Sequence, residues 1–153
     1  AIIKALNHSQ APSAVQCVIN PLNSAGAIGY VSEAFNPQAI LSECQQLDIP
    51  ILAIRAVQAG ALTSSMDRSP HESGFDKSDF EDFDKAQPFR DFAIDWDESP
   101  ASLAHRYALS TQGVSSVILG VKNRIELKEC VEAEAKDLLS QSEIQQIENC
   151  LKH

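Results

Sequence analysis

The tetrapeptide Ile51-Leu52-Ala53-Ile54 decides the fold class, because all four of its side chains are apolar. A strand that is apolar on both faces is typical of a parallel sheet covered by helices. Pro50 stands directly before it, and residues 36–47 show the apolar spacing of a helix that would end there. The tetrapeptide therefore predicts a strand within an α/β fold.

Short apolar runs alternate with helical patterns along the rest of the chain. Residues 15–19 and 114–119 are rich in β-branched side chains and predict two further strands. Three helices should begin after the capping residues Asn36, Ser99 and Ser140, and two more should cover about 87–96 and 124–134. This order favours parallel strands joined by right-handed crossovers, and hence an α/β fold.

The polar stretch that ends near Asp84 is the longest segment without an apolar period. A loop of this length within a domain is typical of a functional or mobile segment. Its acidic cluster predicts a solvated face, with a lid over a substrate as the alternative. The members of this cluster are Asp79, Glu81, Asp82 and Asp84.

The composition narrows the class of protein and its partners. The 153 residues suit one ordinary domain, and 44% hydrophobic with 22% charged residues is typical of a globular protein. A net charge of −9 repels nucleic-acid phosphates, so we expect no nucleic-acid partner. The apolar runs are shorter than the roughly 20 residues of a membrane span. Four cysteines without a C-x-x-C pair predict reduced thiols and a cytoplasmic location.

Three strands are too few to close a barrel, and they leave two sheet edges unpaired. The chain also opens with residues that resemble the end of an amphipathic helix, without a capping residue before them. We therefore expect residues 1–153 to form a single incomplete domain that begins inside a fold.

The turn from Gly120 to Asn123 is the strongest candidate for a ligand site. It joins a predicted strand to a predicted helix, and ligands of parallel α/β folds lie beyond such strand ends. The amide groups at a helix N-terminus bind phosphate, and Lys122 adds a positive charge. The alternative is a tight turn made by Gly120, with Lys122 as a solvated side chain.

Four blocks of sequence, in this order and spacing, resemble those of the aldo-keto reductases. They are Gln16 with Asn20-Pro21-Leu22-Asn23, residues 54–62, the helix at 102–109, and residues 117–123. The resemblance runs from about position 12 to the end of the chain. It implies a partial (β/α)8 TIM barrel, with strands corresponding to the sixth, seventh and eighth.

The first two blocks imply contacts to the nicotinamide end and the pyrophosphate of a cofactor. By this resemblance Gln16 would hydrogen-bond the nicotinamide carboxamide. Many relatives have an aromatic residue at position 54, so stacking becomes aliphatic packing here. The residues at the nicotinamide would be Ile54 and Arg55, and those along the pyrophosphate Val57, Gly60 and Leu62.

The last block implies contacts to the adenosine end of the cofactor. Gly120, Val121 and Lys122 would hold the adenosine phosphate, and Lys122 would favour NADP (NADPH) over NAD. Glu126 and Cys130 stand where many relatives have amide side chains near the adenine. An ionised carboxylate donates no hydrogen bond and a thiol donates poorly, so adenine recognition should differ here.

No catalytic residue is assigned in this chain. The resemblance implies that the family's tyrosine, lysine, aspartate and histidine lie in the other half of the barrel. Tyr30 lies in a predicted loop, and Tyr107 lies on a predicted helix and should be packed. His105 should face a neighbour or solvent, and His71 lacks a second ligand at metal spacing, so we expect no metal site.

These features predict the cofactor-binding half of an NADP-dependent oxidoreductase. The complete enzyme would reduce small aldehydes or ketones by hydride transfer, and this fragment alone would be inactive. One alternative is a non-catalytic half-barrel that binds a nucleotide or a protein, or pairs its open edges with a second copy as a homo-oligomer. Another is an unrelated α/β domain with its strands between helices.

Overall fold

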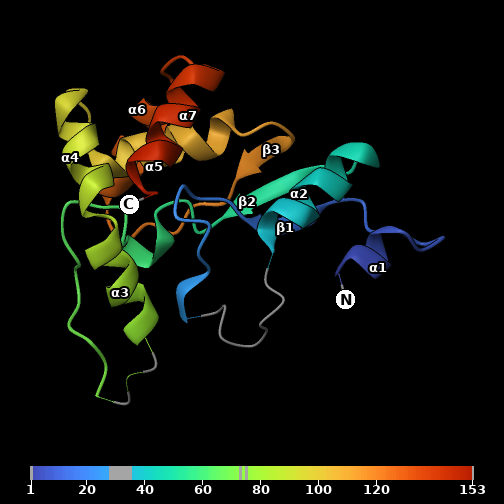
Figure 1. Ribbon diagram of the computed structural model, residues 1–153, viewed down its shortest axis with the longest axis horizontal. Helices are drawn as coiled ribbons and strands as arrows, with labels where there is room; N and C mark the ends of the chain where they lie inside the picture. Colours follow the sequence, from blue (N-terminus) through green and yellow to red (C-terminus); the bar gives the residue numbers. More distant parts are fainter. Residues whose placement is uncertain (1, 28–35, 73, 75, 153) are drawn as a thin grey trace.

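The computed structural model describes residues 2–27, 36–72, 74 and 76–152, and it confirms the α/β fold (Figure 1). Three strands form one parallel sheet in the order β1-β2-β3. The strands are β1 (Val15–Val18), β2 (Ile51–Ile54) and β3 (Val114–Val117). All three lie where the apolar runs predict them.

The helices alternate with the strands as the sequence predicts. Their bounds are α1 (Ile2–Leu6), α2 (Pro37–Gln46), α3 (Lys77–Lys85), α4 (Gln87–Asp95), α5 (Pro100–Ser110), α6 (Arg124–Glu134) and α7 (Gln141–Cys150), with a 3₁₀ turn η2 (Gln58–Gly60). Among the described helices none has the length and apolarity that a membrane span needs.

The predicted capping residues open three of these helices. The Asn36 side chain accepts from the Ala39 amide, and the Ser99 hydroxyl accepts from the Ser102 amide. Ser140 and Glu143 form a capping box at the start of α7. Each cap satisfies amide groups that the first turn leaves without a partner, which fixes where the helix begins.

The sheet has one face in the core and one that is partly open. Side chains alternate between the faces of a strand, so Cys17 and Ala53 share the face that packs against α2 and α5. Gln16, Leu52 and Ser116 align in register on the opposite face, where Gln16 and Ser116 are exposed. The described helices therefore cover mainly one face of this sheet, whereas many parallel sheets have helices packed on both faces.

The acidic segment before Lys85 is partly helical, which corrects the prediction of a loop with a solvated acidic face. Asp79 and Asp82 of α3 are only 4% and 5% exposed, whereas Glu81 and Asp84 are exposed. Residues three apart share one face of a helix. The two buried carboxylates therefore face inward together, toward partners that are distant in sequence.

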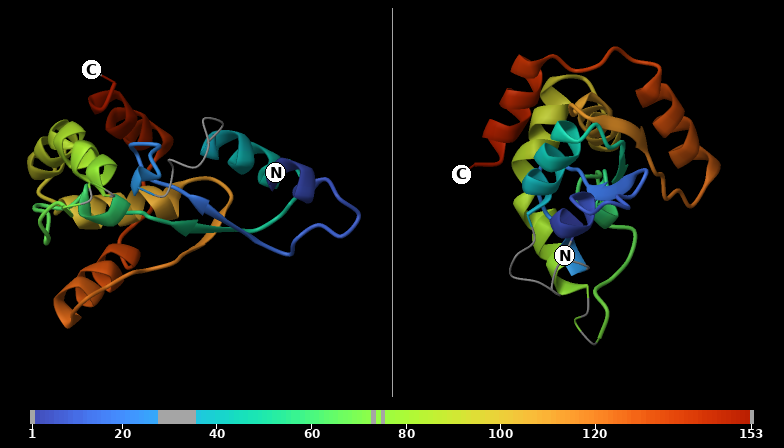
Figure 2. Two further views of the ribbon diagram at one scale, coloured as in Figure 1. Left: turned by 90° about the horizontal axis from the view of Figure 1, so that it is seen from below. Right: turned by 90° about the vertical axis from the view of Figure 1, so that its right-hand side faces the viewer.

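Helix α6 stands apart from the other C-terminal helix. Figure 2 shows α6 and α7 on opposite sides of α5. The extended turn after β3 leads into α6, whose contacts to other elements are made mainly with α5. This arrangement leaves the first turn of α6 facing the segment that follows β2.

Candidate functional site

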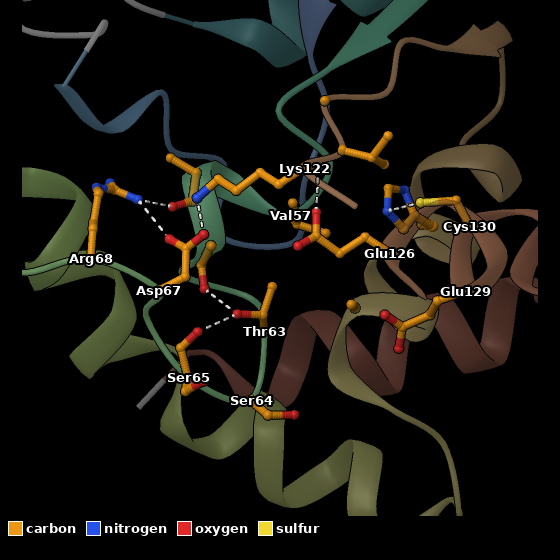
Figure 3. A pocket seen from close by; sticks show the side chains of 16 residues that line it. Val57, Thr63, Ser64, Ser65, Asp67, Arg68, Lys122, Glu126, Glu129 and Cys130 are labelled. Atoms are coloured by element: carbon orange, nitrogen blue, oxygen red, sulfur yellow. Dashed lines mark hydrogen bonds and ion pairs between the residues drawn. The ribbon is translucent and has the colours of Figure 1, made fainter. Parts of the chain in front are cut away.

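A cavity of about 540 Å³ lies beyond the C-terminal ends of β2 and β3 (Figure 3). One wall comes from the segment after β2, between Val57 and Arg68. The other comes from α5, from the turn after β3 and from the first half of α6. Ligands of parallel α/β folds bind at this end of a sheet.

Seven of the eleven residues predicted to contact a cofactor line this cavity. They are Val57, Gly60, Gly120, Val121, Lys122, Glu126 and Cys130. Gly60 has a φ of 96°, which a side chain would strain, so glycine permits the backbone turn at this wall. The structure thus brings two sequence blocks, about 60 residues apart, to one hollow.

The other four predicted residues lie outside the cavity lining. Gln16 is exposed on the open face of β1, and Leu62 is fully buried in the core. Ile54 and Arg55 lie at and just beyond the end of β2 without lining the cavity. Their predicted contacts to the nicotinamide and pyrophosphate stay predictions.

The first turn of α6 is closed by its own side chains. The Asn123 side-chain oxygen accepts from the amides of Ile125 at 2.9 Å and Glu126 at 3.0 Å. The Glu126 carboxylate accepts from the Lys122 amide and from the Asn123 side-chain amide, each at 2.8 Å. The donors that could hold an anion here therefore already contact side-chain oxygens.

Lys122 reaches across the cavity to the opposite segment. Its ammonium forms an ion pair with Asp67, and Figure 3 shows the two side chains extending toward each other. Both side chains are well exposed, so the pair contributes little to stability. Arg68 lies beside it and donates to the Ala59 carbonyl at 2.7 Å. Lys122 is thus exposed as in the alternative prediction, but it is paired with a carboxylate.

A buried histidine on α5 faces a cysteine on α6 at the cavity wall. His105 is 8% exposed, and its Nε2 lies 3.1 Å from the Cys130 Sγ. Burial lowers the pKa of His105, although Glu129 opposes this, and burial raises the pKa of Cys130. The pair is therefore a neutral imidazole and a thiol. The His105 Nδ1 is buried, and it has no hydrogen-bond partner among the described residues.

The sequence alone did not reveal this pair. Ala101 and Ala108 stand four residues before and three residues after His105, and so share its helix face. Such small residues allow a neighbouring helix to approach closely. Their spacing was therefore a sequence signal that the helix face of His105 contacts another helix. Sequence spacing alone does not select Cys130 as the contact of His105.

The model of the family described as Aldo/keto reductase family matches residues 2–152. The chain belongs to the aldo/keto reductase family. A comparison with curated proteins finds no match. Enzymes of this family are oxidoreductases that act on small carbonyl compounds with NADH or NADPH. The three parallel strands and their flanking helices are consistent with a partial (β/α)8 barrel of this family.

In this chain of the aldo/keto reductase family, a buried polar network lies at the ends of β1 and β2. Asp79 of α3 accepts from Arg55 at 2.6 Å, and the Arg55 Nε donates to Gln58 at 2.9 Å. Gln58 in turn donates to Asp82 at 2.7 Å, and Asn20 donates to Gln58 at 3.3 Å. The network fixes α3 against the strand ends and directs Arg55 to a carboxylate of this chain.

Tyr107, the tyrosine among the described residues, is not free to act as a proton donor. The Tyr107 hydroxyl donates to Glu148 at 2.9 Å, and burial together with this carboxylate raises the pKa of Tyr107. Tyr107 is thus packed, as predicted. Tyr30 lies outside the described residues. In the same described part, no three His, Cys, Asp or Glu side chains are grouped to hold a metal ion.

Proposed function

We propose that this chain forms the cofactor-binding part of an NADP-dependent aldo/keto reductase. Hydride would pass between the cofactor and a small aldehyde or ketone. The observation that carries the proposal is the cavity of Figure 3, where residues after β2 and β3 meet at the N-terminus of α6. Residues 1–153 would then act as one incomplete barrel unit.

The preference for NADP rests on the positive charges at the cavity. Lys122 and Arg68 both line it, and the first turn of α6 adds the partial positive charge of a helix N-terminus. A phosphate on the adenosine ribose would meet these groups where it replaces their present partners, Asp67 and Glu126. NAD lacks this phosphate and would not gain from them.

The residues of this chain would bind and orient the cofactor rather than move the proton. The cofactor supplies the hydride when it is bound. Tyr107 donates to Glu148 inside the core. Burial and this carboxylate raise the pKa of Tyr107, which makes it a poor proton donor at neutral pH. We therefore expect no NADPH-dependent carbonyl reduction by this chain alone.

A fluorescence titration of this chain with NADPH, and with NADH in parallel, tests the proposal. Replacing Lys122 by alanine should weaken NADPH binding about tenfold or more and leave NADH binding unchanged. Lys128→Ala is the matched control, because Lys128 lies on the same helix, is exposed and pairs with Glu132. Equal NADPH binding by all three proteins would refute the phosphate role of Lys122.

A second candidate function follows from the open edges of the sheet. The outer strands β1 and β3 each have one neighbour among the described strands, so their free edges could pair with a second copy or another protein. The chain would then be a non-catalytic interaction module or homo-oligomer. Light scattering that shows a monomer at high concentration would contradict pairing between copies.

We also propose a reducing, cytoplasmic location. All four cysteines are free thiols, and three of them are buried: Cys17, Cys44 and Cys130. Free buried thiols are typical of proteins from reducing compartments. Localisation of the tagged protein in cells, together with thiol titration, tests this point.

A further inference from the structure

A carboxylate of the chain already lies at the place where a phosphate would bind. Glu126 lines the cavity, and its two oxygens accept from the Lys122 amide and the Asn123 side-chain amide at 2.8 Å each. A backbone amide and a neighbouring side-chain amide at the start of an 11-residue helix are donors that a phosphate oxygen would take. Glu126 thus resembles a bound anion that is supplied by the chain itself.

The positive charge at this place is also held by a carboxylate. The Lys122 ammonium contacts Asp67, so both the amide and the ammonium of Lys122 have acidic partners. An incoming phosphate would have to displace one or both carboxylates. Until then it would meet like charges, which oppose its binding.

A second polar group lies in the wall of the same cavity. His105 lines it and is more than nine-tenths buried, and one of its ring nitrogens has no hydrogen-bond partner in the part of the chain that the structure describes. A buried polar atom without a partner costs free energy, and His105 therefore marks a polar position in the wall of this cavity.

We propose that Glu126 is a specificity-determining residue that competes with the ribose phosphate of the cofactor. This inference rests on the proposed function. Glu126 weakens binding of nucleotides with a 2′-phosphate, and leaves those without it almost unaffected, because its carboxylate occupies the phosphate donors. The site then discriminates less between NADP and NAD than Lys122 alone would make it.

The variant Glu126→Gln tests the negative charge of the Glu126 side chain separately from its size. Glutamine keeps one side-chain oxygen for the Lys122 amide and removes the negative charge, at almost the same volume. Glu132→Gln is the matched control, because Glu132 is exposed on the same helix and pairs with Lys128 at 3.4 Å. Circular dichroism checks that both variants fold, and Glu126→Ala provides a second variant with the same expected direction.

The test is a calorimetric titration with adenosine 2′,5′-bisphosphate and with adenosine 5′-monophosphate. Glu126→Gln should bind the bisphosphate about tenfold more tightly, and the monophosphate within about twofold of the native chain. Glu132→Gln should change neither affinity. An unchanged bisphosphate affinity, or an equal gain for both nucleotides, would overturn the inference while the cavity remains a nucleotide site. If no protein bound either nucleotide, the proposed function itself would fail.

Discussion

Replacing Asp79 by asparagine should destabilise the fold through one buried charge. The Asp79 side chain is 6% exposed and accepts from the Ala27 amide at 3.0 Å, from Arg55 at 2.6 Å and from Arg68 at 3.1 Å. Asparagine has almost the same shape, but it has one acceptor oxygen and no charge. The variant therefore leaves the Arg55 guanidinium, which is 17% exposed, without its carboxylate partner Asp79.

The magnitude follows from these contacts. Removing one member of a buried ion pair costs about 3–5 kcal/mol. The remaining amide oxygen can still accept one hydrogen bond, and the contact to Arg68, a third of which is exposed, counts for little. We therefore expect a loss of about 2–3 kcal/mol in the free energy of unfolding.

Urea unfolding followed by circular dichroism measures this loss. With a urea dependence of about 1–3 kcal/mol per molar, the midpoint should fall by about 0.7–3 M. Glu81→Gln on the same helix is the control, because its pair with Lys77 is exposed and should contribute less than about 0.5 kcal/mol. The reasoning would be refuted if the free energy of unfolding of Asp79→Asn lay within about 0.5 kcal/mol of the native value, which is the size expected for the control. The network would then not hold α3 in place.

Two further perturbations test neighbouring parts of the fold. Gly26 has a φ of 51°, and a Cβ there would lie 1.9 Å from the Asp79 carboxylate, so Gly26→Ala should lower the free energy of unfolding by about 2 kcal/mol or more in the same urea assay. A cost no larger than that of Gly74→Ala would contradict this close approach, because a Cβ at Gly74 would meet no described atom within 4 Å apart from its chain neighbours. Burial lowers the pKa of His105 in the folded chain, so the unfolded chain binds its proton first, and stability should fall as the pH drops below about 6.5. His105→Gln should flatten the urea midpoints between pH 7.5 and 5.5, and an unchanged slope would assign this pH dependence to other groups.

The sequence predicted the features that depend on neighbours along the chain. The caps at Asn36, Ser99 and Ser140 act on amides within three residues, and the structure confirms all three. The strand Ile51–Ile54 was predicted because four consecutive apolar residues need no distant partner to be recognised. Local rules therefore gave the strands and most helices.

Features that depend on distant partners could not be predicted in the same way. Asp79 lies inside because Arg55, 24 residues earlier, reaches it, and no local pattern of acidic residues distinguishes this from a solvated face. The departure at Glu126 was visible in the sequence. Its contact with the Lys122 amide depends on the path of the turn, which the sequence does not specify.

The buried network at the strand ends constrains how this sequence can diverge. Asn20 donates to Gln58 and Gln58 donates to Asp82, so a change at one position removes a hydrogen bond from a buried neighbour. Neutral drift at these sites would therefore proceed by compensated replacements. Homologues that carry an apolar residue at position 82 should also have lost the amide at position 58, and the two positions should covary despite their separation along the chain.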